Sequence, residues 1–132
     1  MTNAGNNSVA VFSDLSRVDP RALSNTPREL TGSPFKGGGL NNPAGIVIDG
    51  NANAWVANSA PGANSISEIG HVSDMFGNTT GTGAPLSPEA GFVGPGLDRP
   101  FGIALDNSGN VWVTNRGGNS VTVFLGVALP PF

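Results

Sequence analysis

The sequence predicts an all-β protein built from β-propeller blades, each a sheet of four antiparallel strands, arranged in an incomplete ring. One observation behind this prediction is a long segment that occurs twice in the chain. The other is that apolar residues fall in short runs separated by Gly, Asn and Pro, a pattern typical of short strands joined by tight turns. Four such strands in each repeat are the unit of a propeller blade.

The repeat is clearest where residues 40–58, LNNPAGIVIDGNANAWVAN, align without gaps on residues 97–115, LDRPFGIALDNSGNVWVTN. Nine of these nineteen positions are identical at an offset of 57 residues. A third copy is partial, because residues 2–12 match residues 114–124 at eight of eleven positions. The chain therefore contains about two and a third repeats.

Each repeat predicts strands in a fixed order. In the last repeat we expect strands at residues 102–105, 111–114 and 120–124, with a turn at residues 106–110. Asp and Asn bond their own backbone and Gly accepts positive φ, so Asp-Asn-Ser-Gly closes a hairpin. Because side chains alternate along a strand, Trp112 should face away from Val111 and Val113. A fourth strand is expected around residues 86–93, and its counterpart around residues 30–36.

These strands predict one domain, residues 1–132, with blade boundaries set by the repeat. Residues 1–39 form a partial blade with an insertion, residues 40–96 a full blade, residues 97–124 a blade without its last strand, and residues 125–132 a tail. The insertions at residues 13–29 and 70–85 lengthen the repeat beyond the usual blade. Within the first, Asp19 and Pro20 favour one helical turn.

Composition excludes several classes of function. Only 11% of the residues are charged and the net charge is -3, so we expect no nucleic-acid partner. The chain has no Cys, which excludes a disulfide framework and a thiolate metal site. No stretch of this sequence is apolar for long enough to predict membrane insertion, and no motif predicts a cofactor or a metal.

The pattern Pro-x-Gly-Ile-x-x-Asp-x-x-x-Asn-x-Trp-Val-x-Asn, followed by Asn-Ser-Val-x-x-Phe, resembles the NHL-repeat family and the related streptogramin lyase-like β-propellers. The resemblance covers nearly the whole chain apart from the two insertions. It implies a non-catalytic module that binds protein or carbohydrate, as a fragment of a larger bacterial protein, with an extracytoplasmic location favoured. The alternative it implies is part of a lyase whose catalytic residues lie outside this chain. His71, the only histidine, matches no position of the family pattern.

Four recurring polar residues are candidates for ligand binding. Asp49 and Asp106 follow the first strand of a repeat, so a ring of such carboxylates is a candidate divalent-cation site. Turn chemistry explains both residues better, because an Asp that opens a hairpin bonds the next backbone amides. Asn58 and Asn115 end the second strand and are candidates for contacting a ligand at the loops. For them too, a structural role is the favoured interpretation.

Other repeated residues are interpreted as the structural core. Trp55 and Trp112 are candidates for stacking on a sugar or a peptide, but as equivalent residues on second strands they are expected to fill the space between blades. The remaining core positions are equivalent pairs in the two long repeats: Ile46 with Ile103, and Val56 with Val113.

An incomplete ring leaves an apolar blade face open at each end, so a partner must cover it. We expect further blades in cis as the first possibility. The alternative is a homo-oligomeric ring of three chains, in which the strand at residues 30–36 of one chain completes the last blade of the next. That arrangement places one predicted strand twice at each junction, so one copy would have to be displaced.

Overall fold

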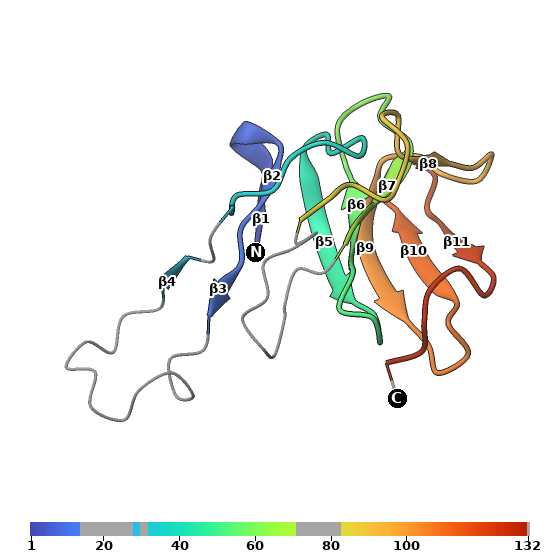
Figure 1. The fold of residues 1–132 in the computed structure, drawn as a ribbon. Coiled ribbons are helices and arrows are strands. Elements are labelled where there is room, and N and C mark those ends of the chain that lie inside the picture. The colour runs from blue at the N-terminus through green and yellow to red at the C-terminus, as the bar shows by residue number, and fades with distance from the viewer. Residues whose placement is uncertain (14–27, 30–31, 71–82, 132) are drawn as a thin grey trace.

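A computed structural model describes residues 1–13, 28–29, 32–70 and 83–131, and Figure 1 shows their arrangement. The predicted helical turn at Asp19, the strand residues Leu30 and Thr31, and His71 lie outside these described residues. The eleven strands within them are β1 (Thr2–Asn3), β2 (Ser8–Val9), β3 (Phe12–Ser13), β4 (Arg28–Glu29), β5 (Pro43–Ile48), β6 (Ala54–Asn58), β7 (Ser65–Ile69), β8 (Phe92–Val93), β9 (Pro100–Leu105), β10 (Val111–Asn115) and β11 (Ser120–Phe124). A single 3-10 turn, η1 (Ala4–Asn6), joins β1 to β2.

All strand pairs are antiparallel and the sheets do not close into a ring, which confirms the predicted all-β fold with incomplete propeller architecture. The complete sheet has the order β5-β6-β7-β8, and the last sheet has the order β11-β10-β9. The sheets follow one another in chain order, with β5 and β9 side by side (Figure 1). Among the described residues, no helix is long and apolar enough to cross a membrane.

The sequence repeat is also a structural repeat. β5 and β9 differ by 57 residues at both ends, as do β6 and β10, whereas β7 and β11 differ by 55 because the preceding loop has two extra residues. Both β5–β6 and β9–β10 contain a register shift at the equivalent place, before the final pair with Asn58 or Asn115. β9 begins two residues before the predicted strand at 102–105, and β10 extends one residue beyond 111–114.

The fourth strand is shorter than the sequence predicts. Of residues 86–93, only Phe92 and Val93 form a regular strand, which pairs with β7. Upstream, Pro85 makes an isolated bridge to Ile69. Pro85 and Pro88 have no amide hydrogen to donate, so a continuous ladder is not possible here. In the first repeat, the described part of residues 30–36 likewise pairs through the single bridge between Val9 and Phe35.

Two apolar clusters hold the sheets together, and they occupy equivalent positions. One unites Val9, Phe35, Leu40, Ala54, Val56 and Ile69, with Val11 and Ile46 packed against them. The other unites Trp55, Ile66, Leu97, Val111, Val113 and Ala128, with Val47, Phe92, Ile103, Leu105 and Phe124 packed against them. In each cluster the later repeat contributes a Leu from the approach loop and two small apolar residues of its second strand. The core therefore lies between consecutive sheets.

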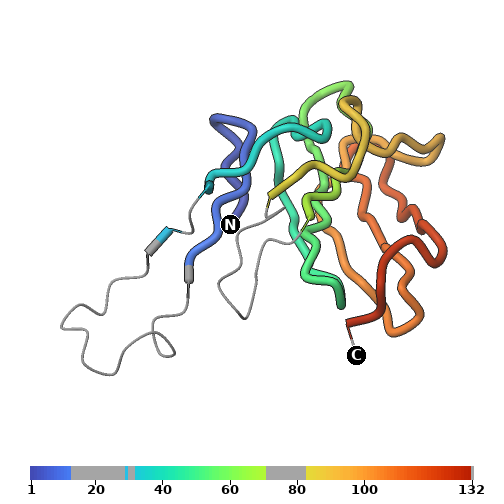
Figure 2. The backbone as a smooth tube through the Cα atoms, viewed as in Figure 1, coloured from blue at the N-terminus to red at the C-terminus, as the bar shows by residue number. Residues whose placement is uncertain are grey.

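The C-terminal tail also connects the last two repeats, as its course in Figure 2 shows. Gly126 donates its amide to Asn110 Oδ1 at 2.9 Å, and Ala128 donates to the Gly109 carbonyl at 3.1 Å. Further along, Gly50 donates its amide to the Leu129 carbonyl at 3.0 Å. The tail thus bonds the β5–β6 turn and the β9–β10 turn together.

A glycine sets the distance between β5 and β9. A Cβ added to Gly45 would lie 2.5 Å from the Phe101 carbonyl oxygen and 3.1 Å from the Ile103 amide nitrogen, both of them backbone atoms. We predict that Gly45→Ala destabilises the protein by ~1–3 kcal/mol, because the two strands must move apart. The measurement is the midpoint of urea unfolding. Gly5→Ala is the control, because a Cβ there meets nothing within 4 Å. Equal midpoints for the two variants would contradict the close approach.

Candidate functional site

The repeated Asp forms the centre of each hairpin. Asp106 Oδ1 accepts hydrogen bonds from the backbone amides of Ser108 (2.8 Å) and Asn110 (3.0 Å). Its Oδ2 accepts from Asn110 Nδ2 (2.8 Å) and from the Trp112 indole Nε1 (2.9 Å). The carboxylate therefore ties the turn to the second strand as well as closing the turn.

Asp49 makes the equivalent bonds one repeat earlier. Its Oδ1 accepts from the amides of Asn51 and Asn53, both at 2.9 Å, and its Oδ2 accepts from Trp55 Nε1 at 3.1 Å. Sequence reasoning anticipated the amide bonds but missed the indole bond. The constant six-residue spacing between Asp and Trp in both repeats is the signal for it.

These contacts bear on the candidate cation site. Asp49 and Asp106 each bond within their own hairpin, and the hairpins belong to different sheets. Across the described parts of the chain, no three His, Cys, Asp or Glu side chains gather in a way that would hold a metal ion. The two carboxylates act in the structure as hydrogen-bond acceptors of the turns.

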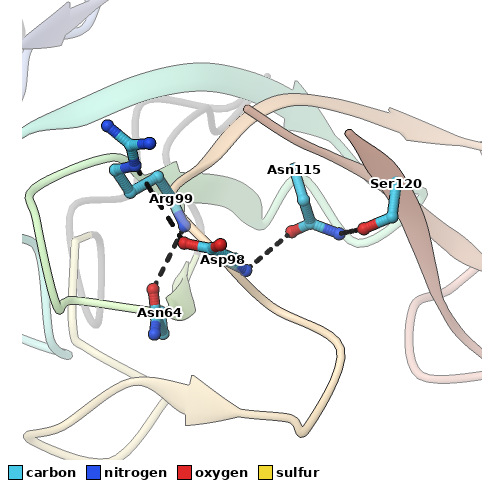
Figure 3. A network of polar contacts seen from close by, with 5 residues as sticks. All are labelled: Asn64, Asp98, Arg99, Asn115 and Ser120. Carbon is cyan, nitrogen blue, oxygen red and sulfur yellow. Dashed lines mark hydrogen bonds and ion pairs between the residues drawn. The ribbon is translucent and has the colours of Figure 1, made fainter. Parts of the chain in front are cut away.

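The repeated Asn at the end of the second strand bonds three parts of its repeat. Asn115 accepts the amide of Asp98 at 3.1 Å and donates to Ser120 Oγ at 3.3 Å and Thr122 Oγ1 at 2.8 Å. Figure 3 shows this arrangement around Asn115 and Ser120. One side chain thus links the approach loop to the strand β11.

Asn58 repeats this pattern inside the complete sheet. It accepts the Asn41 amide at 3.1 Å and donates to Ser65 Oγ at 3.0 Å and Ser67 Oγ at 2.9 Å. Asn58 is fully buried and Asn115 nearly so. In both residues, the side-chain oxygen and the amide hydrogens engage groups of the same repeat.

A second series of Asn residues connects one repeat to the next, and sequence reasoning missed it. Asn64 Oδ1 accepts the backbone amide of Arg99 at 3.1 Å (Figure 3). The equivalent Asn7 accepts the amide of Asn42 at 2.7 Å, again 35 residues further along the chain. Asn119 occupies the same position in the last repeat. All three Asn residues have positive φ and precede a Ser, which is the signal that marks them in the sequence.

Arg99 and Asp98, beside this link, form the only ion pair among the described residues. Arg99 Nε lies 4.0 Å from Asp98 Oδ1, and both side chains are half exposed. An exposed pair at this distance contributes little to stability. The neutral hydrogen bond from the Arg99 backbone amide to Asn64 Oδ1, rather than this charge pair, is the specific connection here.

The two tryptophans have different surroundings despite equivalent sequence contexts. Trp55 is 2% exposed within the cluster between sheets, whereas Trp112 is 44% exposed. Ile66 is fully buried, and the equivalent Val121 is 57% exposed. Of the other core candidates, Val56 and Val113 are fully buried, and Ile46 and Ile103 are partly buried.

Trp112 belongs to an apolar surface on the last sheet. Strand register places Ala104 beside Trp112 and Val121 beside Thr114, and all four residues are exposed. We call these residues, Ala104, Trp112, Thr114 and Val121, the trailing face. Val111 and Val113 point to the opposite side and are fully buried, as strand alternation requires.

A groove lies between the complete sheet and the last sheet. Its volume is about 530 Å³, and its lining residues include Trp55, Glu68, Phe92, Phe124 and Val127. The rings of Trp55 and Phe92 are stacked, with centroids 5.8 Å apart. Burial raises the pKa of the Glu68 carboxyl, although a hydrogen bond from Asn53 acts in the opposite direction. The groove therefore has aromatic walls and one carboxyl group.

The hairpin bonds predict the titration of Asp106. Hydrogen bonds, above all from the Trp112 indole and then from Asn110, hold the pKa of Asp106 far below its ordinary value of 3.8. A lowered folded-state pKa means that the stability contributed by this carboxylate is fully present above pH ~4 and is lost as pH falls through the folded pKa. We expect Trp112→Phe to raise the pKa of Asp106 toward its ordinary value.

Carboxyl carbon NMR across an acid titration measures this change. Trp55→Phe is the matched control, because Trp55 bonds Asp49 and makes no bond to Asp106. Equal Asp106 titrations in the wild type and in Trp112→Phe would show that the indole bond does not act on this carboxyl.

The hydrogen bond between Arg99 and Asn64 predicts that substitutions of the equivalent residues Asn64 and Asn119 differ in their effect on stability. Asn64→Gly preserves the positive φ of 42° but removes the acceptor for the Arg99 amide. The loss of this bond should lower the free energy of unfolding by ~1 kcal/mol. Asn119→Gly, at a φ of 47°, is the control because no bond is described for its side chain. Thermal unfolding measures both variants, and equal changes would rule out a stabilising role for the link.

Comparison of the sequence with known protein families identifies a match to the last repeat. The family model of the NHL repeat matches residues 97–124, which contain β9, β10, β11 and the loop that leads into them. No curated protein matches the chain. The matched segment contains the hairpin in which Trp112 donates to Asp106, and it contains the hydrogen bond from Asn115 to Ser120. Residues 97–124 therefore match the NHL repeat, and the chain is an all-β protein with the sheets of a partial β-propeller.

Proposed function

We propose that this chain is a non-catalytic binding module of a larger bacterial β-propeller protein, and that its trailing face binds a protein surface. The observation that carries the proposal is the difference between equivalent residues. Trp55 and Ile66 are buried by the following repeat, whereas Trp112 and Val121 are 44% and 57% exposed. An exposed apolar patch of this kind marks an interaction site.

The covered face of the complete sheet indicates which side chains a partner of the trailing face should present. There, Trp55 packs in a cluster with Leu97, Val111 and Val113 of the next repeat. We infer that the trailing face takes a surface of the same kind: a Leu from a loop and two small aliphatic side chains on a strand. This is the leading face of an NHL-type repeat, defined here by Leu97, Val111 and Val113.

A protein ligand fits the trailing face better than a carbohydrate. Ala104 and Val123 lie beside Trp112, and Val121 lies beside Thr114; none of these three side chains offers a hydrogen-bonding group. Thr114 Oγ1 is already bonded to Gly102, and the Asp106 carboxylate next to the indole already accepts four hydrogen bonds. The hydroxyl groups of a sugar would lose their water without gaining partners there, which is costly. Aliphatic side chains would lose nothing by the same contact.

We favour further repeats of the same polypeptide, rather than a ring of identical chains, as the partner that covers the trailing face. A second copy would have to present a leading face from its first sheet. That sheet consists of the two short strands β1 and β2 and contains no counterpart of β9. Within the described residues, the first sheet therefore lacks the surface that covers Trp55.

A chain extended by one repeat tests the proposal. Residues 70–131 are appended after Phe124, in the register that β7 and β11 share, and every Trp except the original Trp112 is replaced by Phe. Packing of the new repeat on the trailing face should shift the Trp112 emission to shorter wavelength and reduce its quenching by acrylamide. The physical reason is that the indole leaves water, as that of Trp55 does.

The control extension carries Val111→Asp and Val113→Asp in the appended copy only. Two unpaired carboxylates in the new interface should prevent packing, so Trp112 should remain quenched as in the unextended chain. If the extended chain and this control give the same Trp112 emission and quenching, the trailing face does not bind a leading face and the proposal fails.

A further inference from the structure

The outer edge of β11 is the second unfilled surface of the last sheet. Within the described residues, β11 pairs with β10 on one side and with no strand on the other. The equivalent strand β7 is paired on both sides, with β6 and β8. An unpaired edge presents a row of backbone amides and carbonyls that a further strand can bond.

The segment on the edge of β7 shows what such an edge accepts. Residues 83–93, GAPLSPEAGFV, follow β7 in two stretches, residues 84–87 and 92–93, which are separated by a turn closed by the Gly91 amide and the Pro88 carbonyl. Gly70 donates its amide to the Ala84 carbonyl at 2.8 Å, and Leu86 donates to the Glu68 carbonyl at 2.8 Å. The Glu68 amide donates to Ser87 Oγ at 2.9 Å. By the repeat offset of 55, Val123 and Leu125 occupy the positions of Glu68 and Gly70.

The same segment also packs against Phe35 of the first repeat. Pro85 bridges Ile69, and a Cβ added to Gly83 would overlap the Phe35 ring, so Gly83 lies directly against that ring. One repeat later, the counterparts of Phe35 and Ile69 are Phe92 and Phe124. These two residues line the groove of about 530 Å³, which is therefore the counterpart of the space that Gly83 to Pro85 fill.

We propose that β11 and this groove form a binding site for an extended, proline-containing peptide segment with the pattern Gly-x-Pro-x-Ser. The segment adds antiparallel to β11. Its amide donates to the Val123 carbonyl, and its Ser hydroxyl accepts the Val123 amide. Its Gly-x-Pro portion lies between Phe92 and Phe124. Most of the groove wall is aromatic and Glu68 adds a carboxyl group, so this portion carries no negative charge.

This inference does not rest on the proposed function, because the site and the trailing face lie on opposite sides of the last sheet. Phe124 pairs with the buried Val111, whereas Trp112 points the other way. Covering one surface leaves the other accessible. The two proposals therefore fail separately.

The probe is a synthetic peptide with the sequence of residues 83–93, titrated into the full chain. We expect saturable NMR shifts of the Val123 and Leu125 amides and of the Phe92 ring, with Ala104 and Thr114 unshifted. In the Trp112→Phe variant, Trp55 is the only Trp and lines the groove, so its emission should change along the same binding curve. A peptide with Leu86→Pro lacks the amide that bonds the Val123 carbonyl and should bind about tenfold more weakly or less.

A pair of protein variants locates the binding. Val127→Glu places a charge at the groove, where Val127 is 46% exposed, and should weaken the peptide about tenfold or more. Leu129→Glu is the matched control, because Leu129 is 47% exposed but does not line the groove. Three results would overturn the proposal: no shifts at millimolar peptide, shifts confined to the trailing face, or equal affinities of Val127→Glu and Leu129→Glu.

Discussion

Burial of each sheet by the next is the constraint on which this structure depends. A single repeat of three or four short strands cannot bury its apolar face by itself. Trp55 and Ile66 are buried only because Leu97, Val111 and Val113 of the following repeat lie against them. Gly45 permits this contact by letting the backbones of β5 and β9 approach closely. Each repeat is therefore stable through its neighbours, as in other repeat proteins.

Side-chain hydrogen bonds, rather than ion pairs, hold the turns and strands of this chain together. Charged residues make up only 11% of the chain, and the described part contains one weak ion pair. In their place, Asp49 and Asp106 bond backbone amides and indoles, and Asn58 and Asn115 bond hydroxyl groups across strands. No buried side-chain nitrogen or oxygen in the described residues lacks a partner. Because these bonds are not ion pairs, salt should affect the fold only slightly.

The sequence predicts much of the fold because its signals are local. The hairpin at Asp106 follows from turn residues, and the strands β9, β10 and β11 follow from alternating apolar residues, so their positions were predictable to within two residues. β8 was predicted too long, because Pro85 and Pro88 interrupt the ladder and residues 88–91 form a turn.

The candidate sites were less predictable because they depend on neighbours in space. Trp55 and Trp112 have the same local sequence pattern, and only the presence of a following sheet distinguishes their 2% and 44% exposure. The hydrogen bond from the Arg99 amide to Asn64 joins residues 35 positions apart, and the groove forms between two repeats. Local patterns contain no information on such distances. Comparison of equivalent positions, rather than any single motif, identifies these surfaces.

The C-terminal tail couples the unfolding of the last two repeats. Its backbone bonds Gly50 in one hairpin and Gly109 in the other, so neither turn can open without breaking a bond that reaches its neighbour. In simple repeat arrays, the terminal repeat often unfolds before the others. Here the tail bonds the last two repeats to each other, so they should unfold together. Hydrogen exchange of the Gly50 amide should then report on unfolding of the following repeat.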